Sequence, residues 1–256
     1  MGAKTVINTS PYHGNRNQTR RLISKSNMYY IAGLTMSLPS STQTVEGLAV
    51  FTTFRYFQHV ISRVRAIAPV ANAEAGRIRT TPTSFIGKII SPIHGLSIFV
   101  PLVTYCLCVT FNRFTQPAWM QRMSLPNTYF NYETEVGLRV AACAATFVLL
   151  GFTGRIFTHL GNQWHAIGRR EKPRVVQTGP YAVVRHPLYT SVLIHGLLFA
   201  VMSWSYAPLV GLGITASAFA VKMPIEEDLI MQDSAVAAEY RAYMRRVPAR
   251  IIPFLW

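Results

Sequence analysis

Long apolar runs separated by basic segments constrain this chain more than any other feature of its sequence. The first run covers residues 86–111, and the second covers residues 136–152. Each approaches the roughly 20 apolar residues that a helix needs to cross a bilayer. Arg139, near the start of the second run, is expected to reach the membrane interface with its long side chain. The pattern predicts one spanning helix in each run, at 93–111 and at 136–153.

A third apolar run, 188–223, is interrupted at its centre by the sequence SWSYAP at 203–208. Each arm has about 15 residues, which is short of a full perpendicular span. We therefore expect two linked helices that form a tight hairpin. Trp204 and Tyr206 are expected at the far interface, where aromatic side chains are enriched.

The N-terminal third has a weaker pattern. Residues 1–27 carry basic residues and no acid, which predicts a polar cytosolic tail. Residues 28–38 are apolar but short, and residues 45–61 are apolar but contain Arg55, Gln58 and His59. They fit a hairpin of two helices or one interfacial helix, and we favour the hairpin. The segment 63–84, with several arginines, is expected to be an exposed loop.

The composition favours a membrane protein over a soluble one. Half of the residues are hydrophobic and 14% are charged, against about 25% charged in a typical soluble domain. The formal net charge is +15, and the basic residues gather in the loops 63–88 and 155–185. The positive-inside rule places these loops in the cytosol and the balanced 112–135 loop across the membrane. We expect no nucleic-acid partner.

The polar residues that can carry chemistry concentrate after Leu160. The stretch GPYAVVRHPLY at 179–189 stands at the mouth of the expected hairpin. Pro187 suits the first turn of a helix, where the missing N–H costs nothing. His186 and Tyr189 are three residues apart, so both side chains would face the same side of that helix. The free N–H groups at this end can receive a carboxylate.

A second cluster follows Pro224. Glu226, Glu227 and Asp228 would lie in the first turn of a helix that begins at this proline, where the helix dipole favours acids. They either cap that helix or face a cationic ligand, and the spacing leaves both interpretations open.

The C-terminal tail offers two further pairs. Tyr240 and Tyr243 share a helix face. Arg245 and Arg246 satisfy the dipole at the end of that helix, or they contact anionic lipid or substrate. The spacing again leaves both interpretations open.

Taken in order, these motifs resemble a known family. The pattern T-G-P-Y-x-x-V-R-H-P-x-Y, an apolar hairpin, adjacent acids and then Y-x-x-Y-x-x-R-V-P is similar to the isoprenylcysteine carboxyl methyltransferases, with phospholipid methyltransferases as more distant relatives. The resemblance covers roughly residues 136–256. The family continues its R-H-P-x-Y pattern to a glycine, whereas this chain has Ser191.

The resemblance implies an all-α integral membrane protein, a multi-span helical bundle with a C-terminal hairpin and a cytosolic pocket for S-adenosylmethionine. The tail 1–27, N-terminal membrane helices at 28–135 and a methyltransferase core at 136–256 would make up the chain. No metal is expected. The implied cofactor-binding residues are Tyr181, Arg185, His186, Tyr189, Glu226 and Glu227, and Glu226 is also a catalytic candidate. The chemistry calls for an arginine near the pocket to orient the substrate carboxylate, and Arg246 is the catalytic candidate for this role.

The same resemblance implies an endoplasmic reticulum location and methylation of the α-carboxylate of a C-terminal prenylcysteine. The acceptor would be a prenylated protein or a small lipidated molecule, with its chain between the 136–153 helix and the hairpin. If Arg185 and Tyr181 do not bind the cofactor, they would be membrane-interface residues, Arg185 as an anchor and Tyr181 in the aromatic belt.

Two other functions stay open. Membrane sterol reductases that use NADPH end in a similar V-P-x-R-I-x-P tail, although they have an asparagine where this chain has Leu188. The other alternative is a basic membrane scaffold with a decayed pocket.

Overall fold

The computed structural model describes residues 28–31, 34–37, 41–126, 128, 130–165 and 167–253. Its contacts divide the chain into two units, Met1–Ser40 and Ser41–Trp256. The predicted tail at 1–27 lies outside the described residues.

The described part of the first unit is a pair of strands. Strand β1 (Met28–Ile31) pairs antiparallel with β2 (Leu34–Ser37), with Ile31 opposite Leu34. The helix expected over residues 28–38 is therefore wrong. Tyrosine, isoleucine and threonine favour strands, and two residues between paired strands are the usual length of a hairpin loop.

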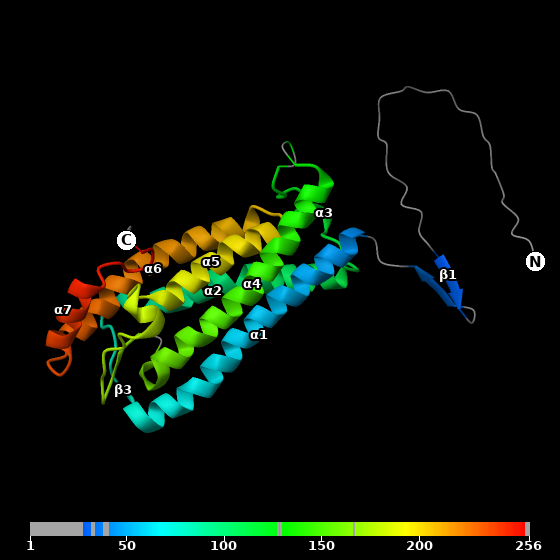
Figure 1. The fold of residues 1–256 in the computed structure, drawn as a ribbon. Helices are drawn as coiled ribbons and strands as arrows, with labels where there is room; N and C mark the ends of the chain where they lie inside the picture. The colour runs from blue at the N-terminus through cyan, green and yellow to red at the C-terminus, as the bar shows by residue number, and fades with distance from the viewer. Residues whose placement is uncertain are drawn as a thin grey trace, which may run out of the picture. The chain divides into compact units, whose positions relative to one another are not determined.

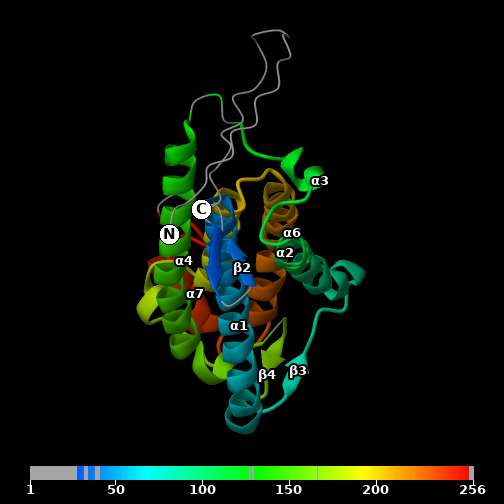
Figure 2. The ribbon, with the colours of Figure 1, turned by 90° about the vertical axis from the view of Figure 1, so that its right-hand side faces the viewer.

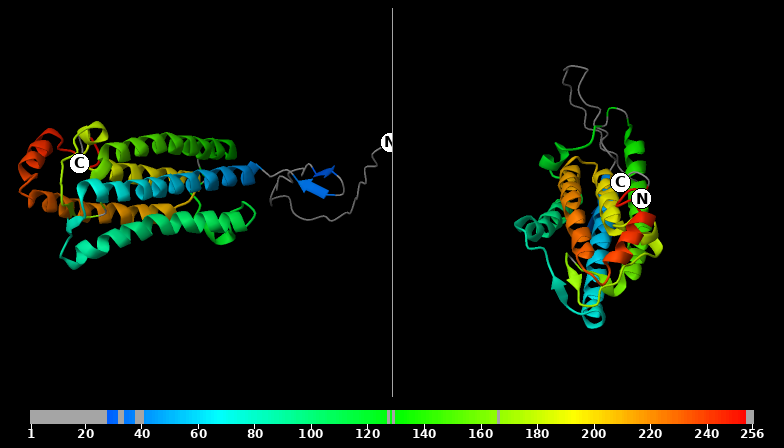
Figure 3. Two further views of the ribbon diagram at one scale, coloured as in Figure 1. Left: turned by 90° about the horizontal axis from the view of Figure 1, so that it is seen from below. Right: turned by 90° about the vertical axis from the view of Figure 1, so that its left-hand side faces the viewer.

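The second unit is a bundle of long helices that lie side by side (Figures 1 and 3). The long helices are α1 (Ser41–Ala75), α2 (Phe85–Phe111), α4 (Tyr132–Leu160), α5 (Pro187–Met202) and α6 (Ala207–Met231). The short elements are β3 (Ile78–Thr80), α3 (Ala118–Gln121), η1 (Gly161–Gln163), β4 (Arg169–Arg170), η2 (Gly179–Ala182) and α7 (Ala237–Arg246).

Three helical segments of the described chain are long and apolar enough to cross a membrane. They are Phe85–Phe111, Tyr132–Gln163 and Ala207–Met231, whereas α5 is apolar but shorter. The first two contain the spans predicted at 93–111 and 136–153. Large apolar side chains on these helices are exposed, such as Leu96 and Val148, as lipid-facing residues are. The chain has the character of a membrane protein.

The connecting segments separate to opposite ends of the bundle (Figure 2). At one end, the link between α5 and α6 bonds to the segment after α3: the Leu125 amide donates to the Trp204 carbonyl at 3.0 Å, and the Tyr206 amide donates to Met123 at 2.8 Å. At the other end, β3 pairs with β4, which joins the two basic segments. This separation is the one that the charge pattern predicted, and which end faces the cytosol stays a prediction.

Helix α1 is one continuous helix of 35 residues. The exposed loop predicted at 63–84 is therefore wrong as far as Ala75. Tertiary contacts hold the last turns of α1: Arg170 Nη1 donates to Asn72 Oδ1 at 2.9 Å, and Asn162 Nδ2 donates to Glu74 Oε2 at 3.0 Å. Arg55, Arg63 and Arg65, which interrupt the apolar pattern of this segment, are exposed on α1, whereas other residues of the helix are packed.

A buried polar network ties the helices together near the α3 end. Glu46 on α1 and Arg139 on α4 form an ion pair with Nη2 2.5 Å from Oε1, and Arg139 Nε donates to the Met202 carbonyl at 2.8 Å. Tyr105 on α2 donates to Glu46 at 2.6 Å. The expectation that Arg139 reaches the interface is wrong, because its guanidinium finds a carboxylate inside the bundle.

Candidate functional site

A cavity of about 450 Å³ opens inside the second unit. One part of its wall is apolar and comes from α1 and α2, with Phe57, Val60 and Ile98 among the side chains. The other part is polar and comes from the 164–186 segment, α5, α6 and α7. This volume suits a small organic ligand, for which pockets of about 300–1,000 Å³ are usual.

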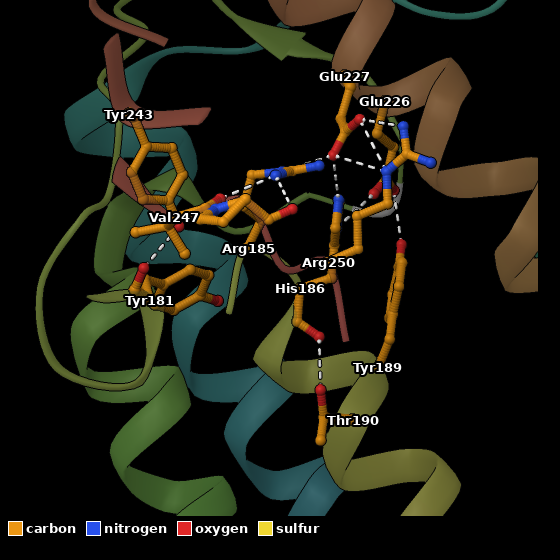
Figure 4. A network of polar contacts seen from close by, with 11 residues as sticks. Tyr181, Arg185, His186, Tyr189, Thr190, Glu226, Glu227, Tyr243, Val247 and Arg250 are labelled. Carbon is orange, nitrogen blue, oxygen red and sulfur yellow. Dashed lines mark hydrogen bonds and ion pairs between the residues drawn. The ribbon is translucent and has the colours of Figure 1, made fainter. Parts of the chain in front are cut away.

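Glu227 organises the polar wall (Figure 4). Its carboxylate accepts from Arg185 Nε at 2.9 Å and from Arg250 Nη2 at 2.7 Å, and it lies 3.2 Å from His186 Nε2. Arg185 Nη1 also donates to the carbonyls of Val247 and Pro248. One buried acid therefore holds the R-H-P motif of the chain against its C-terminal tail.

Backbone hydrogen bonds make this junction firmer. The Arg185 amide donates to the Ala249 carbonyl at 3.0 Å, and the His186 amide donates to the Arg250 carbonyl at 2.8 Å. Helix α5 then begins at Pro187, as the sequence predicted, with His186 as the residue before it.

An aromatic stack lies beside the acids. The rings of His186 and Tyr189 are nearly parallel with centroids 5.4 Å apart, and Tyr189 stacks on Phe219 at 4.1 Å. The two side chains predicted to share a side of the helix do so. Tyr189 donates to Glu226 Oε1 at 2.7 Å, and Lys222 Nζ lies 3.7 Å from the same oxygen. Glu226 lines the cavity, whereas the carboxylate of Glu227 points into the ion-pair cluster.

The acids do not begin a helix. Pro224 lies inside α6, and Glu226 and Glu227 occupy the last turns of this helix. The capping interpretation is wrong, because the helix dipole disfavours acids near a C-terminus. Apart from Lys222 on α6 itself, their partners are cations and a hydroxyl from other elements, so tertiary contacts rather than the helix dipole hold these acids.

Arg246 does not belong to the cavity wall in the described residues, although the sequence analysis made it a catalytic candidate. It is exposed at the end of α7 and donates to the Gln177 side chain. Tyr243 and Val247 take the inward positions of this segment, so the Arg246 side chain extends outward. Its place at the helix end suits the dipole interpretation.

Three tyrosines complete the polar wall. Tyr240 and Tyr243 share one face of α7, as predicted, and the Tyr243 hydroxyl donates to the Tyr181 carbonyl at 2.6 Å. Burial raises the pKa of Tyr181, Tyr240 and Tyr243, so these hydroxyls stay protonated donors at neutral pH.

Ser191 lies at a closely packed contact between α5 and α4. It is fully buried, and its hydroxyl lies 2.5 Å from that of Thr153 on α4. A small residue with one hydroxyl therefore keeps α5 close to α4.

Several lining residues were absent from the sequence-based candidates. His165, Arg169 and Lys222 line the polar part of the cavity. On α1, the lining residues Phe57, Val60, Ile61 and Val64 follow the spacing of one helix face, a signal that was present in the sequence but was cut by the intervening arginines.

Comparison with models of known protein families gives no match, and comparison with curated proteins gives none.

Proposed function

We propose that this protein transfers a methyl group from S-adenosylmethionine to the α-carboxylate of a prenylcysteine, as an isoprenylcysteine O-methyltransferase does. The observation that carries the proposal is the meeting of the motifs that resemble this family. Arg185, His186 and Tyr189 come from one segment and Glu226 from another, and all four line the same cavity. Motifs that matched by chance would have no reason to converge there.

The donor set of the wall fits the cofactor. S-adenosylmethionine supplies a methyl group on a sulfonium, and it also carries an ammonium and an adenine ring. The Glu226 carboxylate suits a cation, and the aromatic side chains that line the cavity suit contact with a sulfonium or a flat ring. Lys222 Nζ lies 5.2 Å from the Tyr189 ring centroid, so this ring already accepts a cation.

The proposed reaction asks little acid–base chemistry of the protein. The α-carboxylate of a prenylcysteine has a pKa of about 3.5, so it is ionised at neutral pH and needs no general base. The chain has to orient this carboxylate and exclude water. The mixture of basic, acidic and aromatic groups at the polar wall supports that role.

The apolar part of the cavity supports a lipidated acceptor. Apolar side chains of α1 and α2 form part of its wall, and Phe57 and Phe99 meet there edge to face with centroids 5.3 Å apart. The sequence predicts the lipid chain between the 136–153 helix and the α5–α6 segment, but these helices meet directly at Thr153 and Ser191, so we prefer the apolar wall from α1 and α2. We therefore place the prenyl chain between α1 and α2.

Unprenylated acceptors are expected to be poor substrates. Each buried CH₂ contributes about 0.8 kcal/mol, although partitioning into the membrane supplies part of this before binding. We expect ready turnover of N-acetyl-S-farnesylcysteine and almost none of N-acetylcysteine, measured as methyl transfer in nanodiscs at matched concentrations. Equal rates on the two acceptors would contradict the lipid site.

Substitution of Glu226 with glutamine is expected to weaken S-adenosylmethionine binding by about 1–3 kcal/mol, since the charged acceptor is lost. Isothermal titration calorimetry on the purified variant measures this effect. Asp228→Asn is the matched control, because Asp228 is on the same helix but exposed. An unchanged affinity in the Glu226→Gln variant would remove this acid from the cofactor site.

The charge pattern supports an orientation with the cavity end of the bundle toward the cytosol. In this orientation the basic segments around β3 and β4 face the anionic leaflet, and membrane lipids are partners of these segments. We propose the endoplasmic reticulum membrane as the location, on the resemblance alone.

A reductase is the second candidate. The tail at 247–251, which resembles that of sterol reductases, holds Arg185 and His186 at the cavity. Against it, Leu188 lines the cavity where those enzymes have asparagine.

A further inference from the structure

The guanidinium of Arg169 is buried at the cavity wall with donors that are not used. Arg169 is 6% exposed and lies on β4, and it lines the cavity. Its Nε is 3.5 Å from Asp233 Oδ2, yet neither Nε nor Nη2 has a hydrogen-bond partner among the residues that the structure describes. A buried cation with unused donors is costly, and most proteins avoid it.

The neighbouring Arg170 differs from Arg169 in that its guanidinium is fully hydrogen-bonded. It is as buried as Arg169, but all of its nitrogens donate. Nε and Nη2 bind the Trp164 carbonyl at 2.9 and 2.6 Å, and Nη1 binds Asn72 and the Gly76 carbonyl. Arg170 therefore links its loop to the end of α1, whereas Nε and Nη2 of Arg169 have no hydrogen-bond partner in the described chain although Arg169 lines the cavity.

Asp233 is an ion-pair partner of Arg169, but Nε and Nη2 of the guanidinium stay without a hydrogen bond in the described chain. His165 also lines the cavity, and its buried Nδ1 has no partner in the described chain. Burial lowers the pKa of His165 to about 4, with further contributions from Arg169, Arg170 and Lys222. The histidine is therefore neutral at pH 7, and one of its nitrogens can donate. Glu226 is already engaged by Tyr189 and Lys222.

We propose that Arg169 and His165 form a carboxylate-binding site inside the cavity. This inference rests on the proposed function and assigns to Arg169 the role expected of Arg246. The planar guanidinium matches a carboxylate with two parallel hydrogen bonds, and a bound anion offsets the cost of burying the charge. The carboxylate is either that of the acceptor or that of the methionyl part of the cofactor.

The test measures affinity by calorimetry for two pairs of probes. One pair is N-acetyl-S-farnesylcysteine and its carboxamide, and the other is S-adenosylmethionine and its decarboxylated form. In the Arg169→Met variant we expect the affinity for the carboxylate member of one pair to fall on the order of tenfold to a hundredfold, with little change for its neutral or decarboxylated partner. The pair that responds identifies the source of the carboxylate.

Two further variants keep the result specific. Arg169→Lys retains the positive charge but not the paired donors of the guanidinium, so its affinity for the carboxylate probe should lie between those of the wild type and Arg169→Met. This variant also tests the site if Arg169→Met does not fold. Arg246→Met is the matched control and should bind all four probes as the wild type does. Equal affinities of wild type and folded Arg169 variants, or equal losses for both members of a pair, would overturn the inference alone. A wild-type protein that binds none of the probes would contradict both the inference and the proposed function.

Discussion

Replacing Glu227 with alanine is expected to destabilise the folded protein by about 3–5 kcal/mol, the usual cost of removing one partner of a buried ion pair. Glu227 is 5% exposed and is the shared partner of Arg185, His186 and Arg250. Its loss leaves the Arg185 guanidinium buried without its carboxylate. The α5 start and the C-terminal tail should then separate, and cofactor binding should be lost with them.

Denaturant unfolding of the purified protein in detergent measures this cost. Glu227→Gln is expected to lose less, because the amide oxygen still accepts one hydrogen bond. Asp228→Asn, which changes an exposed acid of the same helix, should stay within about 0.5 kcal/mol of the wild type. A Glu227→Ala protein as stable as this control would show that the cluster does not hold the tail.

The second large effect is expected from Glu46→Ala, at the other end of the bundle. Glu46 is 2% exposed and binds Arg139, Tyr105 and Gln116, so its removal takes the nearest carboxylate from a buried arginine and one acceptor from each of two buried donors. We expect a loss of about 3–5 kcal/mol in unfolding free energy. Cofactor affinity in the protein that remains folded should be unchanged, since Glu46 is outside the cavity wall.

A double-mutant cycle separates the ion pair from simple packing loss. The variant with both Glu46→Ala and Arg139→Met removes the charge that the single variant leaves without its nearest carboxylate, so it should be more stable than Glu46→Ala alone. Additive losses from the two substitutions would contradict a direct pairing between them.

The spans in α2 and α4 could be predicted because apolar composition over about 20 residues is a local property. The prediction of a short second arm at 188–223 was wrong, because α6 continues through Pro224 to Met231 and is long enough to span. The extent of α1 could not be predicted, because Arg63 and Arg65 break the apolar pattern and the last turns depend on Asn72 and Glu74 meeting residues far along the chain. The difference in hydrogen bonding between Arg169 and Arg170 likewise depends on tertiary partners, which sequence spacing does not reveal.

The candidate site was predictable in part. The resemblance implied that the R-H-P segment and the acids lie at one pocket but not that they pair with each other, and the common side of His186 and Tyr189 followed from helix geometry. Pro224 misled the prediction, because a proline also occurs inside long helices, as it does in α6. Arg246 was chosen by charge alone, and the structure gives the inward positions of that segment to Tyr243 and Val247.

The most direct test of the central claim is methyl transfer by the purified wild-type protein in nanodiscs. The assay supplies S-adenosylmethionine labelled on its methyl group and N-acetyl-S-farnesylcysteine, and it follows the label into a base-labile methyl ester. We expect the ester to form with S-adenosylmethionine, and we expect no oxidation of NADPH when a sterol is supplied instead. Absence of ester together with absence of S-adenosylmethionine binding, or NADPH-dependent reduction of a sterol, would contradict the account.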